Sequence, residues 1–400
     1  MEKSIKERTA PSQALIGVVA VSVGALVANI YYAQPLIASI GPSIGIGTAL
    51  SGSLVSVTQI GYGAGLFFLV SLADLVENRR LVLIAVAVVI AGLVAIGLSQ
   101  TAVAFCLASL CTGVCASAAQ ILVPFIAHLA PPERRGRVVG TVMGGLLTGI
   151  MLARPMALFI AGSFGWRIVF FVSAALMLAI GVALARAVPR YQPRQGLHYG
   201  QVLASMLGIL RERPPVRWRA LYQSLMFCAF NLFWTTVPLL LAQRFGLSEH
   251  AIGLFALAGT GGALAAPIAG HLADRGYIAA ATAGAMAVLG LSFAGAIPVS
   301  GTVGLVWLAL LAVLIDAAVQ VNQVTGQHII FSVPADIRGR VNAIYMTFVF
   351  IGGALGSVLG TVLYARCGWA ATAACGAVIG LVALSFHVIE RMQGRQRVQA

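Results

Sequence analysis

No charged residue interrupts the stretch LVLIAVAVVIAGLVAIGLS at residues 81–99. At a rise of 1.5 Å per residue, a helix over these positions is about as long as the roughly 30 Å hydrocarbon core of a bilayer. An open strand would leave its backbone polar groups unpaired in lipid, so a helix is the expected form. The stretch therefore predicts a helix that crosses a membrane.

Eleven further apolar stretches of similar length occur along the 400 residues, of which 60% are apolar and 9% charged. Soluble proteins contain about 25% charged residues. The chain is therefore predicted to be an all-α integral membrane protein with twelve transmembrane helices. We place them near 13–36, 48–70, 81–99, 102–128, 138–161, 168–187, 220–242, 250–272, 278–297, 303–329, 341–364 and 369–389. The cationic start is similar to a secretory signal, but its apolar run is too long, and we expect an uncleaved first helix.

The net charge of +14 is distributed on one side of this arrangement. If both termini are cytoplasmic, all cationic side chains lie on the cytoplasmic side except Arg154, Arg167, Arg244 and Arg366. This is the positive-inside pattern of a membrane protein, and we expect a bacterial-type inner membrane. Scattered loop arginines do not form the single basic face that binds nucleic acid, so we expect no nucleic-acid partner.

The chain repeats itself after 200 to 203 residues. Ser71-Leu-Ala-Asp74 recurs as His271-Leu-Ala-Asp274, and Pro132-Glu-Arg-Arg-Gly-Arg-Val138 as Ala335-Asp-Ile-Arg-Gly-Arg-Val341. Gly165-Trp166 also recurs as Gly368-Trp369. Such a repeat predicts two pseudo-symmetric six-helix bundles, residues 1–187 and 220–400, related by an axis along the membrane normal.

Residues 188–219 between the bundles form the only long loop, and this linker contains four prolines. Apolar residues inside it follow helical spacing: Val202, Leu203, Met206, Leu207 and Leu210. We expect an amphipathic helix on the cytoplasmic leaflet, and the alternative is a disordered basic linker.

In the loops between the second and third predicted helices of each half, the chain resembles members of the major facilitator superfamily. In that family, each half of the protein carries Gly-x-x-x-Asp-Arg-x-Gly-Arg-Arg in this loop. The second half matches this motif at Gly270, Asp274 and Arg275, and the first half at Asp74, Arg79 and Arg80. Val70 and Leu75 depart from it. Gly165-Trp166-Arg167 is similar to the drug and metabolite efflux branch. The resemblance implies a major facilitator fold and secondary transport.

The loop carboxylates are interpreted as parts of a cytoplasmic gate. Asp74 would lie near Arg340 at the start of the eleventh helix, because a helix N-terminus and a cation both favour an anion. Asp274 would face Arg137 at the start of the fifth helix in the same way. The alternative is a loop turn with solvated charges.

Antiporters of the efflux branch carry Gly-x-x-x-Gly-Pro-x-x-Gly-Gly in the fifth helix. Here Gly145 and Gly149 match this pattern, while Arg154 departs from it. The eleventh helix repeats the small-residue spacing at Gly352, Gly356 and Gly360. Small residues at every fourth position allow helix backbones to approach closely in lipid.

Arg154 and Asp316 are the only formally charged residues in the interior of the predicted spans, because Arg186 lies one residue from the end of the span 168–187. A charge in hydrocarbon is costly, so such residues usually face a cavity or a partner. Asp316 begins a polar stripe with Gln320, Gln323 and Gln327, whose spacing places all four on one helix face. The stripe is predicted to line a cavity, and the alternative is an interhelix hydrogen-bond ladder. Arg154 and Asp316 lie at depths that allow pairing, and they are predicted to serve proton coupling; a static salt bridge is the alternative.

Further polar and aromatic residues are candidates for the substrate cavity: Asn29, Tyr31, Tyr32, Gln34, Gln59, Gln120, Asn231 and Trp234. Aromatic residues also anchor helices at membrane interfaces, which is the alternative for the tyrosines and the tryptophan.

The only lysines are Lys3 and Lys6, so no phosphate-binding loop of the ATPase type can exist. Neither catalytic motifs nor a metal-ligand framework occur, so we expect no enzyme, no cofactor and no metal. The leading hypothesis is a monomeric secondary active transporter for proton-coupled efflux of a small amphipathic compound by alternating access. The alternative is uptake or facilitated diffusion of a small organic anion that binds Arg154. A channel or a non-transporting sensor stays open as a further class.

Overall fold

The computed structural model describes residues 11–73, 75–131, 134–190, 198–299, 301–334 and 337–399. The first half of the chain contains α1 (Gln13–Ala28), η1 (Gln34–Leu36), α2 (Ile37–Ser43), α3 (Thr48–Leu72), α4 (Asn78–Leu98), α5 (Ala102–Ala116), α6 (Ala119–Leu129), α7 (Arg135–Phe164) and α8 (Trp166–Ala187). After α9 (Tyr199–Glu212), the second half contains α10 (Pro214–Phe245), α11 (Glu249–Thr260), η2 (Gly261–Leu264), α12 (Ala265–Asp274), α13 (Ile278–Gly295), α14 (Gly301–Ile330) and α15 (Arg338–Gln399).

Ten helical segments within the described ranges are long and apolar enough to cross a membrane. Three predicted spans are interrupted: the first changes to a turn and η1 after Ala28, the fourth divides into α5 and α6, and the eighth contains η2. In contrast, α15 joins two predicted spans through Gly368. The predicted all-helical membrane fold is confirmed, while the count of twelve helices stays a prediction.

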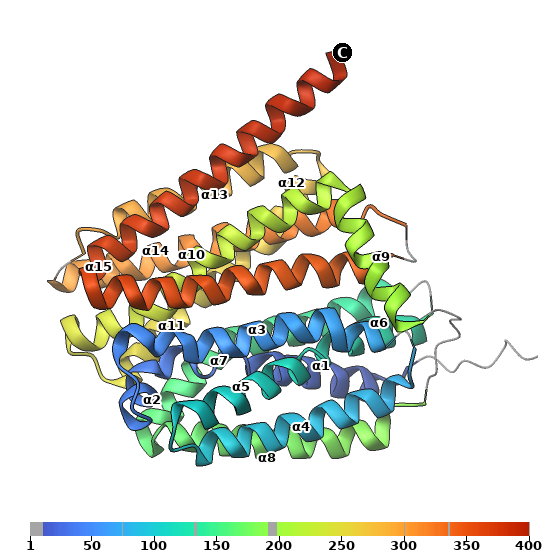
Figure 1. The fold of residues 1–400 in the computed structure, drawn as a ribbon, viewed down its shortest axis with the longest axis horizontal. Coiled ribbons are helices and arrows are strands. Elements are labelled where there is room, and N and C mark those ends of the chain that lie inside the picture. The colour runs from blue at the N-terminus through green and yellow to red at the C-terminus, as the bar shows by residue number, and fades with distance from the viewer. Residues whose placement is uncertain are drawn as a thin grey trace, which may run out of the picture.

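The helices form two groups that lie side by side in Figure 1, with α1–α8 below and α10 and α12–α15 above, while α11 lies at the boundary, level with α3. The halves contact each other chiefly where α3 packs against α15 and where α7 packs against α11. The starts of α4, α7 and α15, which carry Arg79, Arg135 and Arg338, lie at one end of the helices, which we call the arginine-rich end. The opposite end carries α2 and the start of α11.

The predicted small-residue ridges bring helices together in both halves. A Cβ atom added to Gly149 of α7 would lie 2.6 Å from Gly24 Cα of α1. A Cβ atom on Gly356 of α15 would lie 2.9 Å from Cys228 Cα of α10. Backbones this close tolerate only glycine, so each ridge determines how near its helix approaches a neighbour.

The repeated Gly-Trp pair has the same local structure in both halves. Gly165 and Gly368 have φ values of +84° and +75°, which glycine adopts without the steric cost of a Cβ atom. Each is followed by a buried tryptophan, Trp166 or Trp369, which begins the next helix. The last helix of each half therefore begins with the same sharp turn.

Helix α9 bridges the two halves at the arginine-rich end. Its side chains Val202, Met206 and Ile209 are buried. Tyr199 donates a hydrogen bond to the carbonyl of Phe68 in α3 (3.0 Å), and Arg340 of α15 donates one to Ser205 of α9 (3.3 Å). Residues 191–197 of the linker lie outside the described residues.

Candidate functional site

Arg154 is enclosed by three aromatic rings in the middle of the fold. Its guanidinium carbon lies 5.1 Å from the ring centre of Tyr31, 5.0 Å from that of Phe230 and 4.8 Å from that of Trp234. The side chain is only 6% exposed. Cation–π attraction is strongest where the cation is removed from water, so the rings stabilise the buried charge.

The edge of the same guanidinium is only partly hydrogen-bonded. Arg154 donates from Nε to Gln34 Oε1 (3.0 Å), whereas Nη2 is buried without a hydrogen-bond partner. A buried donor of a charged group without an acceptor is unfavourable. The unused donor is therefore suited to an acceptor that a ligand brings.

Asp316 lies beside this arginine, but Trp234 connects the two side chains. The indole Nε1 of Trp234 donates to Asp316 Oδ1 (2.7 Å), while its ring lies against Arg154. Among ion pairs of 4.0 Å or less between described residues, none joins Arg154 to Asp316 directly. The predicted charge pair is therefore one electrostatic site with an aromatic side chain in contact with both members.

A glycine-rich break in the eighth span makes room for Asp316. A Cβ atom on Gly259 would contact Cζ2 of the Trp234 ring and would lie 2.8 Å from its Cη2 and 2.9 Å from Asp316 Oδ2. A Cβ atom on Gly262 would lie 2.7 Å from the backbone nitrogen of Ala317. Because α11 changes to η2 between these glycines, the break in the helix lies directly against the carboxylate of Asp316.

Buried amides connect the two halves next to Arg154. Gln34 donates from Nε2 to Asn231 Oδ1 (3.0 Å) and to Thr235 Oγ1 (3.1 Å), and Gln59 donates to the same Asn231 oxygen (2.6 Å). Gln34, Gln59 and Asn231 are completely buried. They therefore form a polar layer behind the charged site, between the first half and α10.

A cavity of about 490 Å³ extends from Arg154 and Asp316 between the halves. It reaches Val139, near the start of α7, and Phe331, just beyond the end of α14, both at the arginine-rich end. Several predicted residues line it: Tyr31, Gln120, Arg154, Asp316, Gln320, Gln323 and Gln327. The stripe on α14 thus faces the cavity along its length.

Six other predicted cavity residues do not line this space: Asn29, Tyr32, Gln34, Gln59, Asn231 and Trp234. Gln34, Gln59, Asn231 and Trp234 lie behind the lining in the contacts described above. Asn29 accepts a hydrogen bond from Ser173 of α8 (2.6 Å) within its own half. For Asn29, Tyr32 and Gln34 the reason is the end of α1 at Ala28, which a continuous helical spacing does not reveal.

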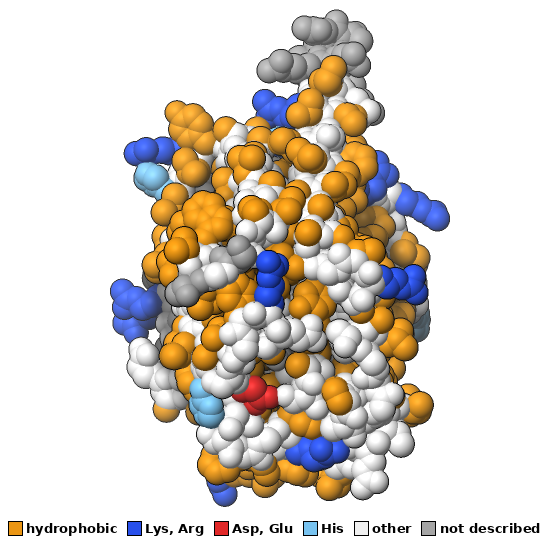
Figure 2. All heavy atoms as spheres, turned by 90° about the vertical axis from the view of Figure 1, so that its left-hand side faces the viewer, with side chains coloured by type: hydrophobic (Ala, Val, Ile, Leu, Met, Phe, Trp, Pro, Cys, Tyr) orange, Lys and Arg blue, Asp and Glu red, His pale blue; other side chains and the backbone are white. Residues whose placement is uncertain are grey.

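The opposite end of the cavity is closed by contacts between the halves that the sequence analysis missed. Ser39 of α2 donates a hydrogen bond to Glu249 at the start of α11, and Ser163 of α7 shares one with His250 (3.1 Å). Figure 2 shows this end of the molecule, and apart from the grey residues its surface consists of closely packed side chains and backbone. Glu249 is the one acidic residue between the predicted spans 220–242 and 250–272, and this was the available signal for it.

The predicted gate residues are apart at the arginine-rich end. Asp274 lies 3.9 Å from His328, while Arg137 and Arg275 are exposed and Gly270 is partly buried in α12. Arg79 donates a hydrogen bond to the carbonyl of Ala185 in its own half, and Arg80 is exposed. Arg340 contacts α9, and Asp74 lies outside the described residues. Their gating roles stay predictions.

No group of three or more His, Cys, Asp or Glu side chains could hold a metal ion within the described ranges.

Comparison with known proteins identifies a family over most of the chain. The sequence pattern of the Major Facilitator Superfamily matches residues 18–356. The chain is 39% identical over 374 residues to the uncharacterised transporter YgaY of Escherichia coli O157:H7, covering 93% of this chain and 94% of that protein.

Solved structures of low sequence identity share the fold. The human organic anion transporter MFSD10 superposes with a TM-score of 0.67 at 16% identity, covering 94% of this chain and 99% of that chain. A D-xylose–proton symporter superposes with a TM-score of 0.72 at 16% identity, covering 94% and 96% of the two chains.

Proposed function

Because the chain belongs to the Major Facilitator Superfamily of transporters, we propose that it exports a small amphipathic compound in exchange for protons by alternating access. The observation that carries this proposal is the cavity, whose wall contains a carboxylate and a guanidinium near each other, among aromatic and amide side chains. Its walls combine apolar residues with a few polar groups, the usual composition of a site for an organic ligand.

Proton coupling is assigned to Asp316. Its carboxylate lies in the cavity wall, accepts a hydrogen bond from Trp234 and senses the charge of Arg154. Intramembrane carboxylates with such partners are typical of proton relays. With Arg154 charged, protonation of Asp316 changes the net charge of the pair from zero to +1. The affinity of the site for a charged substrate therefore depends on whether Asp316 carries a proton.

Alternating access is supported by the difference between the two ends of the cavity. The lining extends to the arginine-rich end, which the positive-inside rule assigns to the cytoplasm of a bacterial-type inner membrane. The other end is closed by α7 and α11 and by the contacts of Ser39 with Glu249. Loading from the cytoplasm followed by rocking of the halves would carry the compound outward.

Everted membrane vesicles with an imposed pH gradient test this proposal. Compounds are first selected by their effect on the melting temperature of the purified protein. A transported compound is expected to dissipate the gradient with the wild type and not with Asp316→Asn. Glu212→Gln, which removes an exposed carboxylate of α9, is the matched control and should behave as the wild type. Equal dissipation by Asp316→Asn would remove this carboxylate from the coupling step.

A second candidate, uptake or facilitated diffusion of an organic anion, is favoured by one observation. Nη2 of Arg154 is a buried charged donor without a partner, and carboxylates bind arginine through paired hydrogen bonds. The structural likeness to the human organic anion transporter MFSD10 is compatible with this class. Arg154→Lys keeps the charge but not the planar fork, so weaker binding of a carboxylate substrate is expected. Unaltered affinity would exclude this candidate.

A further inference from the structure

A groove of about 440 Å³ lies outside the central cavity, where the start of α4 meets the segment after α8. It is lined by charged residues at one end and apolar ones at the other: Glu77, Arg79, Arg80, Leu83, Ile84, Ala87 and Arg190. α4 packs mainly against α5 and α8 of its own half. The groove therefore lies on the outside of the first half, at the arginine-rich end.

The charged end of the groove has an excess of two positive charges, because three arginines face one glutamate. Arg190 lies 4.0 Å from Glu77, but its side chain is 82% exposed. Such an exposed pair is weak and can rearrange around another anion. Arg80 is exposed, and Nε of Arg79 is buried without a hydrogen-bond partner.

The apolar end continues along α4 toward the middle of the predicted span. Leu83, Ile84 and Ala87 follow the arginines by one to two helical turns, or roughly 5–12 Å at 1.5 Å per residue. Ile84 is 54% exposed although its side chain is entirely hydrocarbon. A ligand that fits both ends has an anionic head at the membrane boundary and a hydrocarbon chain below it.

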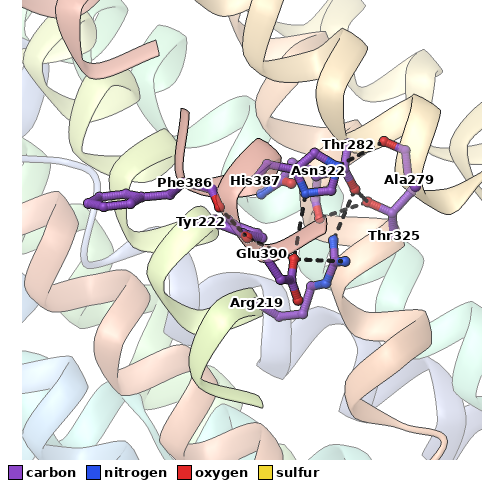
Figure 3. A network of polar contacts seen from close by, with 9 residues as sticks. All are labelled: Arg219, Tyr222, Ala279, Thr282, Asn322, Thr325, Phe386, His387 and Glu390. Atoms are coloured by element: carbon purple, nitrogen blue, oxygen red, sulfur yellow. Dashed lines mark hydrogen bonds and ion pairs between the residues drawn. The ribbon is translucent and has the colours of Figure 1, made fainter. Parts of the chain in front are cut away.

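At the corresponding place in the second half, alanines stand where the first half has two arginines. Ala279 and Ala280 occupy the positions 200 residues after Arg79 and Arg80. Nearby, Glu390 of α15 accepts a hydrogen bond from Tyr222 (2.7 Å) and lies 3.9 Å from Arg219 (Figure 3).

The charges of this cluster are paired within the second half, although Nε of Arg219 and Nδ1 of His387 are buried without a hydrogen-bond partner. Arg219 also donates to Thr282 of α13 (3.1 Å), and His387 contacts the carbonyl of Ala279 (3.2 Å), as Figure 3 shows. The charges of the second half are thus paired inside the bundle, whereas those of the first half face outward into a groove. The fold repeat alone does not require this asymmetry.

We propose that the groove between the start of α4 and the segment after α8 binds an anionic phospholipid, with its phosphate on Arg79, Arg80 and Arg190 and one acyl chain along Leu83, Ile84 and Ala87. Basic pockets beside transmembrane helices bind anionic head groups in this way. Phosphate oxygens match the fork of an arginine, and the apolar wall distinguishes a lipid from a free anion.

Titration of the purified full-length protein with dioleoyl phosphatidylglycerol, followed by native mass spectrometry, tests the proposal. The double variant Arg80→Gln/Arg190→Gln is expected to bind this lipid about 30-fold more weakly, from the usual contribution of each basic residue near a membrane surface. Dioleoyl phosphatidylcholine should bind weakly and equally to both proteins. Ile84→Gln should weaken phosphatidylglycerol binding while leaving all three arginines in place.

Arg244→Gln/Arg366→Gln is the matched control, because it removes two exposed arginines at the opposite end. It should bind phosphatidylglycerol as the wild type does. Equal weakening by both double variants would show a general charge effect and overturn the proposal. Displacement of the lipid by inorganic phosphate at equal efficiency would assign the arginines to a free anion instead. Unchanged melting temperatures of the variants exclude loss of folding as the cause.

Discussion

Gly149→Ala is expected to disturb the site through the packing of α7 on α1. The added methyl group would lie 2.6 Å from Gly24 Cα and also against the Gly24 carbonyl, a contact with backbone that no side-chain rotation can relieve. Arg154 follows Gly149 on α7, and its partners Tyr31 and Gln34 follow α1. Separation of the two helices therefore also separates the arginine from these partners.

The magnitude follows from two opposed contributions. Alanine in place of glycine favours a helix by about 1 kcal/mol, whereas forcing extra atoms into a packed region costs about 1–3 kcal/mol. Gly144 of the same helix has no atom within 4 Å of its added Cβ, so Gly144→Ala retains only the favourable contribution. The two variants should differ in stability by about 1–3 kcal/mol, with Gly144→Ala more stable than the wild type and Gly149→Ala no more stable than it.

Thermal unfolding of the purified protein in one detergent measures this difference. A change of 1 kcal/mol shifts the melting temperature by about 2–4 °C for 150–250 residues and by less in a longer chain, so a separation of a few degrees is expected. Transport by Gly149→Ala should fall, while Gly144→Ala should transport like the wild type. If Gly149→Ala melted at or above the temperature of Gly144→Ala, the packing argument would be refuted.

Three further substitutions test separate contacts. Trp234→Phe keeps a ring beside Arg154 but removes the hydrogen-bond donor to Asp316. Because a hydrogen bond to a charged group contributes about 1.5–3 kcal/mol, proton-coupled transport should fall roughly ten-fold or more without loss of folding. Unchanged transport rates would show that this hydrogen bond has no role. Ser39→Ala removes the contact with Glu249 and should increase labelling of the closed end by a membrane-impermeant reagent, whereas equal labelling would mean that other contacts keep it shut. Glu390→Ala leaves a buried arginine unpaired and should lower the melting temperature clearly, and an unchanged value would indicate that the cluster is not structural.

The intramembrane site illustrates how far residue spacing can be used. Arg154, Asp316 and the glutamines of α14 stand out because polar side chains are costly in hydrocarbon, and their spacing predicts a common face. The cavity lining by Gln320, Gln323 and Gln327 agrees with that spacing. The contact of Trp234 with both charged side chains involves three helices far apart in the sequence, and no periodicity indicates it.

The arginines of the loops show the opposite limit. Arg79 and Arg80 belong to a motif that the family resemblance connects with a gate, yet here they line a groove on the outer face of the first half. A repeat predicts equivalent positions, but it does not predict whether the charges at those positions are paired within the bundle. The neighbours from other helices decide this, as Arg219 and Glu390 demonstrate in the second half.

Local patterns determined the membrane location and the helical class, because each depends on the cost of exposing backbone or charge to lipid along a single segment. The breaks after Ala28 and at Gly261, the closure of one end and the aromatic enclosure of Arg154 were decided by the tertiary structure alone. They depend on steric contacts between the backbones and side chains of different helices, and these contacts exist only once the helices are packed.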